Sequence, residues 1–403
     1  MREKIVVTAM GAVTPIGIGI ENYWNNLISG KSGIARIKSI DPSELPVQIA
    51  AEVKDFNPED YMDKKLVRNT DRFSQFAYIA ADEVLKGGLP VESERMGIVL
   101  GTAMSGITPT AETQEKLTLS ERKVVEPRFV PRILGNMAAT QITIAHGIKG
   151  PSFTVSTACA SGGDAISAAA RLLLADEADA VIAVGAESSI CPLVIHSLAS
   201  ARALSRENDR PEWACRPFDE DHNGFVMGEG GGAIILMREK DALAKGVKIY
   251  AELAGWANTA DAYHMTAPSP DGDGAGRCMA AALKKAGMAP EEIGYINAHG
   301  TATKEGDKDE SLAVGRIFEG HLPHIGSTKG ATGHMMGAGG LTEAIASILA
   351  INEGILPPTL NLENPAFNLP FVKTEAIKEN ITASMSNAFG FGGQNSSLIF
   401  RKY

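Results

Sequence analysis

Ser156 to Gly163 is an unbroken run of small residues with Cys159 at its centre. The segment before it, Phe153-Thr-Val-Ser, is β-branched and aromatic, which is typical of a buried strand. The segment after it, Asp164 to Ala175, is rich in Ala, Ile and Leu, which predicts a helix that is packed on most sides. Cys159 is therefore expected at a sharp turn from strand to helix, at or just before the helix N-terminus.

This placement allows two interpretations of Cys159. The first is a buried structural cysteine, because free cysteines are commonly buried. The second is a nucleophile, because unpaired backbone N–H groups and the positive end of the helix dipole would lower the pKa of the thiol. The small neighbours also leave room for a substrate, and the local sequence does not decide between the two.

Composition narrows the class of protein. The chain has 403 residues, 44% of them hydrophobic and 6% aromatic, with 42 glycines, which suits tightly packed layers of helix and sheet. The net charge of -10 argues against nucleic acid as the main partner. Four cysteines without a CxxC pair suggest reduced thiols and a cytoplasmic protein, and no apolar run long enough to cross a membrane is present.

Predicted strands alternate with predicted helices along the chain, which indicates an α/β fold. Met96–Gly101 and Asp179–Gly185 are continuous apolar strands, as in a parallel sheet covered on both faces. A basic stretch at Asp63 to Arg72 opens a helix that is expected to run to Leu85, and Met137–His146 is a second predicted helix.

Two halves of the chain, residues 1–247 and 248–403, carry a faint internal similarity. Ser156-Thr157 precedes Cys159 and a helix of small residues, and Ser327-Thr328 precedes Lys329, His334 and another such helix. Unless it is a chance match, this predicts a duplicated β/α unit with two sheets and a shared central helix layer.

Three further motifs place polar groups after predicted strands: Asn297-Ala-His299-Gly-Thr301-Ala-Thr303, Lys329-Gly-Ala-Thr-Gly-His334, and Asn387-Ala-Phe389-Gly-Phe391-Gly-Gly-Gln-Asn395. Each alone is consistent with a structural histidine or an ordinary glycine turn. The third is expected to be a special loop rather than a strand, with Phe391 as a movable plug. None matches a phosphate-binding or dinucleotide-binding loop or a zinc site.

Taken together, one cysteine and two histidines indicate acyl transfer through a thioester on Cys159. Two imidazole N–H donors, from His299 and His334, could stabilise an enolate on one carbonyl oxygen. An enolate beside a thioester is what carbon–carbon bond formation requires.

The chain resembles the β-ketoacyl-ACP synthases of type II fatty acid and polyketide systems, in particular the elongating type with two active-site histidines. The resemblance covers essentially the whole chain and rests on Thr-Ala-Cys159-Ala-Ser, His299-Gly-Thr-Ala-Thr and Lys329-Gly-Ala-Thr-Gly-His334 in the family's order and spacing. It implies a thiolase-type fold in five layers, αβαβα. It also implies a decarboxylative Claisen condensation of malonyl-ACP with an acyl group on Cys159, without a cofactor.

The resemblance also implies roles for single residues. Cys159 is the nucleophile, His299 and His334 hold the malonyl thioester carbonyl, Lys329 organises the site, and Phe391 gates it. The backbone N–H groups of Cys159 and Phe391 would form an oxyanion hole. Substrate-binding positions are expected at Thr301, Thr303, Met104, Phe129, Glu310 and Asp307. Met104 would line the acyl pocket, Phe129 would reach the pocket of a second subunit, Asp307 would lie on the same segment as Glu310, and Glu310 would be a buried acid paired near Lys329.

Partners follow from the same resemblance. Lys64, Lys65 and Arg68 fall where the family docks the acidic acyl carrier protein. A homodimer is expected, and a heterodimer with a chain-length-type subunit is the alternative. Substitutions such as Ser161-Gly-Gly-Asp164 leave open whether the pathway makes fatty acids or polyketides. The alternative function is a non-catalytic ketosynthase-like subunit, against which the intact Cys159 argues.

Overall fold

The computed structural model describes residues 3–121 and 123–403. Two sets of five strands have the same order and directions. In the first half the sheet order is β1 (Ile5–Thr14), β8 (Gly230–Arg238), β7 (Ala180–Glu187), β5 (Met96–Gly101) and β6 (Ser152–Val155). In the second it is β9 (Ala251–Ala260), β15 (Gln394–Arg401), β14 (Ala383–Gly390), β10 (Tyr295–Asn297) and β11 (His324–Gly326).

The match between the halves extends to strand direction. In each, the first three strands of the sheet order pair antiparallel and the last three pair parallel. The predicted duplication is therefore confirmed, with one addition. β1 and β9 also pair with each other, with Ile5 opposite Leu253, so that within the described residues the two sheets form one continuous eleven-stranded sheet together with β2 (Gly17–Ile18).

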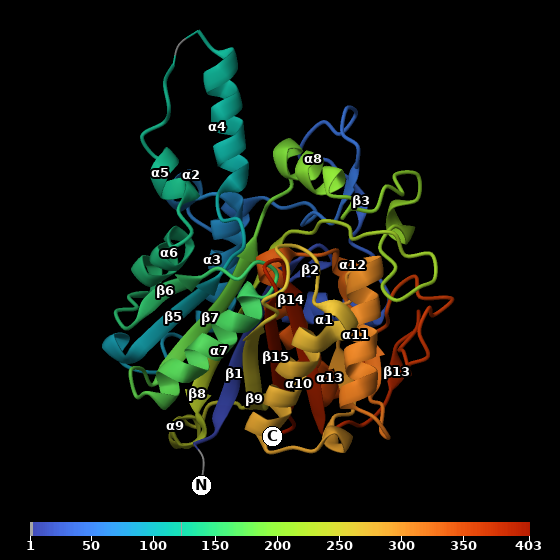
Figure 1. Cartoon of the computed structure of the whole chain (residues 1–403). Coiled ribbons are helices and arrows are strands. Elements are labelled where there is room, and N and C mark those ends of the chain that lie inside the picture. Colours follow the sequence, from blue (N-terminus) through green and yellow to red (C-terminus); the bar gives the residue numbers. More distant parts are fainter. Residues whose placement is uncertain (1–2, 122) are drawn as a thin grey trace.

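Helices cover and separate the two halves of this sheet (Figure 1). α3 (Arg72–Leu85) and α6 (Met137–His146) cover the outer face of the first half. α10 (Asp273–Ala286) and α11 (Lys304–Ile317) cover the second. α7 (Ser161–Leu174) and α13 (Gly339–Glu353) lie between them, which completes the five-layered thiolase-type arrangement.

The strand β7 illustrates why its sequence needs two covered faces. Val181 and Ala183 point into the central apolar cluster with α7 and α13, whereas Ile182 and Val184 point into the cluster beneath α3 and α6. Side chains alternate across a strand, so a strand covered on both faces is apolar at every position. This explains the continuous apolar run in the sequence.

Glycines allow the two central helices to meet closely. A Cβ on Gly162 of α7 would lie 2.7 Å from the backbone nitrogen of Leu341, and one on Gly340 of α13 would lie 2.9 Å from that of Gly163. Because real Cβ atoms do not approach so closely, only glycine fits at this crossing. It brings the N-terminal ends of both central helices together.

The other elements connect this framework. The helices are α1 (Ile20–Ile28), α2 (Lys64–Asn69), α4 (Ile107–Leu119), α5 (Phe129–Ile133), α8 (Pro192–Ser200), α9 (Glu239–Lys245) and α12 (Lys329–Thr332). The short strands are β3 (Ala35–Arg36), β4 (Ile49–Ala50), β12 (Ile355–Leu356) and β13 (Ile377–Lys378). The 3₁₀ turns are η1 (Pro58–Asp60), η2 (Ser93–Arg95), η3 (Pro211–Trp213), η4 (Pro270–Gly272), η5 (Pro290–Glu292) and η6 (Met336–Ala338). Of the helices in the described ranges, none has the length and apolar character needed to cross a bilayer.

Three predictions about local structure were wrong. The strand before Cys159 was expected to be buried, but β6 lies at the edge of the sheet among the described residues and its Phe153 is exposed. The helix expected from residue 63 to residue 85 is broken into α2 and α3, because Thr70 and Asp71 are extended and the Thr70 hydroxyl donates to the Leu66 carbonyl at 2.8 Å. The C-terminal motif is also not a loop throughout. β14 continues to Gly390, and only Phe391 to Gly393 form the turn of a β-hairpin.

Candidate active site

The turn that carries Cys159 is closed by hydrogen bonds and covered by backbone. Ala158 has φ 51°, an unusual value for a residue with a Cβ. The Ser161 hydroxyl accepts the Thr157 N–H at 2.9 Å and donates to the Ala158 carbonyl at 2.6 Å. A Cβ on Gly390 would lie 2.7 Å from the Thr157 carbonyl oxygen. The turn that carries Cys159 is therefore held in one conformation beneath the β14–β15 hairpin.

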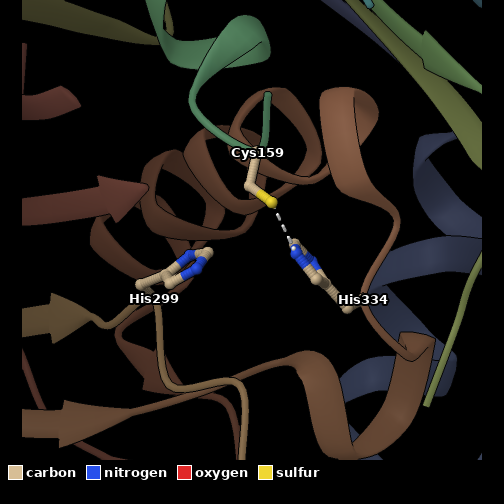
Figure 2. A group of neighbouring side chains, drawn as sticks. All are labelled: Cys159, His299 and His334. Atoms are coloured by element: carbon tan, nitrogen blue, oxygen red, sulfur yellow. Dashed lines mark hydrogen bonds between the residues drawn. The ribbon is translucent and has the colours of Figure 1, made fainter. Parts of the chain in front are cut away.

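Two histidines from the second half face this cysteine (Figure 2). His299 follows β10, and its backbone N–H donates to Glu310 at 2.9 Å. His334 lies between α12 and η6, and its backbone N–H donates to the Val226 carbonyl at 2.7 Å. The Nε2 atom of His334 is 2.9 Å from the Cys159 sulfur, and the centroids of the two imidazole rings are 5.4 Å apart. One ligand atom from each of the three residues lies within 4.8 Å of the other two.

The site is buried, and its charge state follows from this. Burial lowers the pKa of both His299 and His334 well below the usual value, and the positive charge of Lys329 adds to the effect. Both rings are therefore neutral at physiological pH. Among the described residues, neither Nδ1 atom has a hydrogen-bond partner. The Nδ1 side therefore does not set the tautomer of either ring in the described residues, so each Nε2 atom can carry the proton or accept one.

The predicted low pKa of the Cys159 thiol was wrong. Burial raises that pKa to about 12, and this outweighs the opposing effects of the Lys329 charge and of a hydrogen bond from the Phe391 backbone. The helix N-terminus at Ser161 does not compensate for the loss of hydration. The resting site therefore holds a neutral thiol, which can donate its proton to Nε2 of His334.

Lys329 pairs with an acid other than the predicted one. Its ammonium group forms an ion pair with Glu343 of α13, and the side chains are 1% and 3% exposed. Glu310 instead accepts the backbone N–H groups of His299 and Gly300, at 2.9 and 2.8 Å. Glu343 was missed, although it is the lone acid in the apolar segment from Met336 to Asn352. A single acid in an otherwise apolar segment is the sequence signal that could have identified Glu343.

Asp307 holds the same loop as Glu310. Its carboxylate accepts the backbone N–H of Phe218 at 2.7 Å and that of Ala302 at 3.1 Å, and burial raises its pKa to about 8. Glu310 borders the cavity above Cys159, whereas Asp307 does not. Direct substrate contact by Asp307 is therefore excluded by its position, and its contacts fit a role in shaping the loop.

A cavity of about 800 Å³ opens above the three residues. Among the residues singled out in the sequence, its lining includes Met104, Cys159, His299, Thr301, Thr303, Glu310, His334 and Phe391. The hydroxyls of Thr301 and Thr303 are 3.0 Å apart, and Phe391 is 43% exposed at the hairpin turn. One aromatic neighbour of the histidines was missed: Phe225 lies edge-on to His334. Phe389, from the C-terminal motif, lies edge-on to His299.

Six predicted residues lie outside this cavity lining, and Asp307, described above, is one of them. Lys64, Lys65 and Arg68 are exposed on α2, whose first turn is capped by the Asp63 carboxylate at 2.9 Å from the N–H groups of Lys65 and Leu66. Phe129 is partly exposed at the start of α5. Lys329 is also absent from the lining, because it lies buried beneath the histidines' loops.

The sulfur and two imidazole nitrogens are a donor set that a soft divalent metal could use. Two observations make the fit poor. The positive charge of Lys329 acts on both histidines, and neither Nδ1 atom meets the acceptor that normally orients a metal-bound histidine.

Comparison with known proteins agrees with this geometry. The N-terminal domain model of beta-ketoacyl synthases matches residues 2–242, and the C-terminal domain model matches residues 250–363. The protein called 3-oxoacyl-[acyl-carrier-protein] synthase 2 from Synechocystis sp. is 42% identical over 410 residues, covering 100% of this chain and 99% of that protein. The protein of the same name from Coxiella burnetii is 40% identical over 409 residues, covering 100% of this chain and 99% of its own length.

Solved structures give the same result. The ishigamide ketosynthase/chain length factor superposes with a TM-score of 0.93 at 31% identity, and a beta-ketoacyl synthase from Burkholderia phymatum with 0.91 at 32%. A type II PKS ketosynthase in complex with its acyl-carrier protein superposes with 0.91 at 29%. All three comparisons cover 100% of both chains. The chain therefore belongs to the beta-ketoacyl synthase family.

Proposed function

We propose that this protein is an elongating β-ketoacyl-ACP synthase, an acyltransferase that joins an acyl group to malonyl-ACP with loss of CO2. The observation that carries the proposal is a buried thiol with two neutral imidazoles, all within 4.8 Å at the base of one cavity. The names of full-length relatives at about 40% identity support the same reaction.

Acyl transfer comes first. The Cys159 sulfur attacks the thioester carbonyl of acyl-ACP, its proton passes to Nε2 of His334 at 2.9 Å, and the pantetheine thiol leaves with a proton. The tetrahedral oxyanion would accept the backbone N–H groups of Cys159 and Phe391. A neutral His334 suits this step, because a protonated ring could not take the proton.

Condensation follows. Malonyl-ACP places its thioester carbonyl between His299 and His334, and loss of CO2 leaves an enolate whose oxygen accepts both Nε2–H groups. The enolate carbon then attacks the acyl carbonyl on Cys159, and the C–S bond breaks. The leaving thiolate takes up one proton from solvent, because loss of CO2 from the malonyl carboxylate supplies none. Neutral rings serve here as hydrogen-bond donors that do not simply protonate the carbanion.

Other residues are proposed to support these steps. The buried Lys329 keeps both histidines neutral and partly offsets the burial of the thiol. Thr301 and Thr303 line the cavity and would bind the pantetheine arm, and Phe391 at the hairpin turn would gate it. Met104 lies at the wall of the cavity and would limit the acyl chain.

The acyl carrier protein is the proposed partner. The three exposed basic residues of α2 would meet its acidic surface. A solved relative is described as a ketosynthase in complex with its acyl-carrier protein, which supports this partner class. We also propose a cytoplasmic location, because a reducing compartment keeps Cys159 a free thiol.

A homodimer is proposed as the assembly. Exposed apolar side chains gather in the segment from α4 to β6, including Leu119, Val130, Ile144 and Phe153, and β6 is an edge strand among the described residues. A second copy would cover them and receive Phe129. One relative is named a ketosynthase/chain length factor, so a heterodimer is the alternative. We also propose that the boundary between the two halves of each chain lies between residues 247 and 248, in the segment that joins α9 to β9.

The alternative function, a non-catalytic subunit, is not favoured. Such a subunit needs no nucleophile, whereas here Cys159, His299 and His334 converge. The relatives that are named as synthases support catalysis as well.

Intact mass after incubation with a panel of acyl-ACP thioesters tests the proposal. A mass gain of one acyl group is expected, and Cys159→Ala should show none. No gain with any donor would contradict the assignment of Cys159.

A further inference from the structure

A buried carboxylate outside the catalytic set connects the two walls of the acyl cavity. Glu187, the last residue of β7, is fully buried. It accepts the backbone N–H of Ala103 at 2.7 Å and that of Met104 at 3.2 Å. The same carboxylate accepts the N–H of Gly337 at 3.3 Å. One side chain thus holds the segment before α4 and the segment that follows His334.

Both segments line the cavity, and each contains a residue whose backbone conformation is strained. Met104 lines one wall and Met336 another. Next to these contacts, Ser105 has φ 51° and Met336 has φ 44°, in the left-handed region that non-glycine residues rarely adopt. Such conformations persist only where surrounding contacts fix them. Here the Ser105 N–H donates to the Thr102 hydroxyl at 3.3 Å, and Glu187 accepts the N–H groups of the neighbouring Met104 and Gly337.

The fit leaves little freedom for another arrangement. A Cβ on Gly337 would lie 2.6 Å from the Ala103 nitrogen and 2.9 Å from a carboxylate oxygen of Glu187. The backbone of Gly337 therefore packs directly against that of Ala103, and the Glu187 carboxylate contacts both. Charged acceptors make the stronger kind of hydrogen bond to backbone N–H groups.

We propose that Glu187 is a positioning residue that sets the width of the acyl cavity, by holding Met104 and Met336 at a fixed separation, and so determines which acyl chains reach Cys159. This inference rests on the proposed acyl transfer to Cys159. Glu187 touches no reacting atom, and it is proposed to act on chain length through the two methionines. Its charge also raises the pKa of Cys159, which affects all donors alike, so the ratio of rates between donors reports on the cavity.

The test compares acylation of Cys159 by a series of acyl-ACP donors of increasing length, followed by intact mass. In Glu187→Gln an amide N–H2 group must face backbone N–H donors or leave one unpaired. The ratio of acylation rates for the longest and shortest accepted chains is expected to change by about tenfold. Glu187→Asp, which keeps the charge, should recover part of the wild-type ratio.

Two further variants keep the test decisive. Gly337→Ala pushes the same walls apart from the opposite side and should shift the ratio too, even if Glu187→Gln folds poorly. Glu83→Gln is the matched control, because Glu83 also accepts two backbone N–H groups, those of Ala12 and Ile20, away from this cavity. It should leave the ratio unchanged.

An unchanged ratio in folded Glu187→Gln and Gly337→Ala would overturn the inference. So would an equal change in Glu83→Gln. If wild-type protein accepted no acyl group at all, the proposed function would fail instead, so the two failures are distinguishable.

Discussion

The two central helices occupy equivalent places in the two halves, but the segments that lead into them carry different chemistry. Between β6 and α7 the chain makes one tight turn, which holds Cys159. Between β11 and α13 it inserts α12 and η6, which adds Lys329 and His334. The helices differ as well: α13 is buried along nearly its whole length, whereas α7 exposes Arg171.

This difference shows how one repeated framework was specialised twice. The first half supplies the atom proposed to hold the acyl group, and the second supplies the groups proposed to generate the carbanion. The N-terminal ends of both central helices meet, so the groups that precede them lie close together. The two halves can therefore differ in chemistry while they keep the same strand order. Substitutions should therefore separate the two partial reactions by half.

The largest effect is expected when the second half loses an imidazole. His299→Ala should lower malonyl-ACP decarboxylation by about 10²–10³-fold, because one oxyanion donor is lost, while acylation of Cys159 remains largely intact. His334→Ala should lower both, since its Nε2 also contacts the sulfur. Release of CO2 and intact mass measure the two steps.

The exposed His321 provides the control, and His321→Ala should change neither step. If His299→Ala spared decarboxylation, the assignment of the enolate to the second half would be wrong.

The burial of α13 predicts the next effect. Lys329→Met leaves the carboxylate of Glu343 buried without its partner and should lower the free energy of unfolding by about 3–5 kcal/mol. The double variant Lys329→Met/Glu343→Gln should recover most of the loss. Chemical denaturation measures both.

Arg171→Met on α7 is the comparison, because this arginine is exposed and, among the described residues, its hydrogen bonds go to the side chains of Ser167 and Asn258. A change below about 1 kcal/mol is expected there. An equal loss in the free energy of unfolding for Lys329→Met and Arg171→Met would contradict the expected difference between the buried ion pair and the exposed arginine.

The raised pKa of Cys159, about 12, predicts how its reactivity depends on pH. Below its pKa the thiolate fraction of a thiol rises tenfold with each pH unit. Alkylation of Cys159 by iodoacetamide should therefore rise by about tenfold per unit from about pH 7 to 10. Mass spectrometry of the modified protein follows it, with Cys159→Ala to subtract the other thiols. A plateau below about pH 8 would instead restore the low pKa expected from the helix N-terminus.

The smallest effect concerns the contact between the helices. Gly162→Ala and Gly340→Ala each force a Cβ against backbone and should destabilise the protein by about 1–3 kcal/mol. Gly315→Ala on α11 is the control, because a Cβ there meets nothing within 4 Å, and it should stabilise by about 0.5–1 kcal/mol. Thermal unfolding distinguishes the three. Similar losses in all three would mean that helix propensity, and not the crossing, decides.

Local pattern was enough to predict much of the fold. The helix Met137–His146 and the strand Met96–Gly101 have the predicted bounds, because their apolar periodicity is set by the layers they face. The break between α2 and α3 was not predictable from periodicity, since it depends on one threonine hydroxyl bonding back to the helix. Likewise, Phe389 and Gly390 stay in a strand because β15 pairs with them.

The candidate site divides in the same way. The sequence was enough to identify the motifs around Cys159, His299 and His334, because each motif follows a predicted strand. The ion-pair partner of Lys329 could not be identified from the sequence, since Glu343 reaches it through the packing of α13. The thiol pKa was misjudged because the sequence shows the nearby helix N-terminus but not the depth of burial.

The pairing of β1 with β9 joins the ends of two halves that each hold only part of the reactive set. A chain severed between residues 247 and 248 would produce two fragments, one with the thiol and one with both imidazoles. Neither fragment is a smaller enzyme. Covalent continuity between the halves therefore keeps the thiol and the imidazoles at a fixed separation, which two separate fragments would reach only by associating.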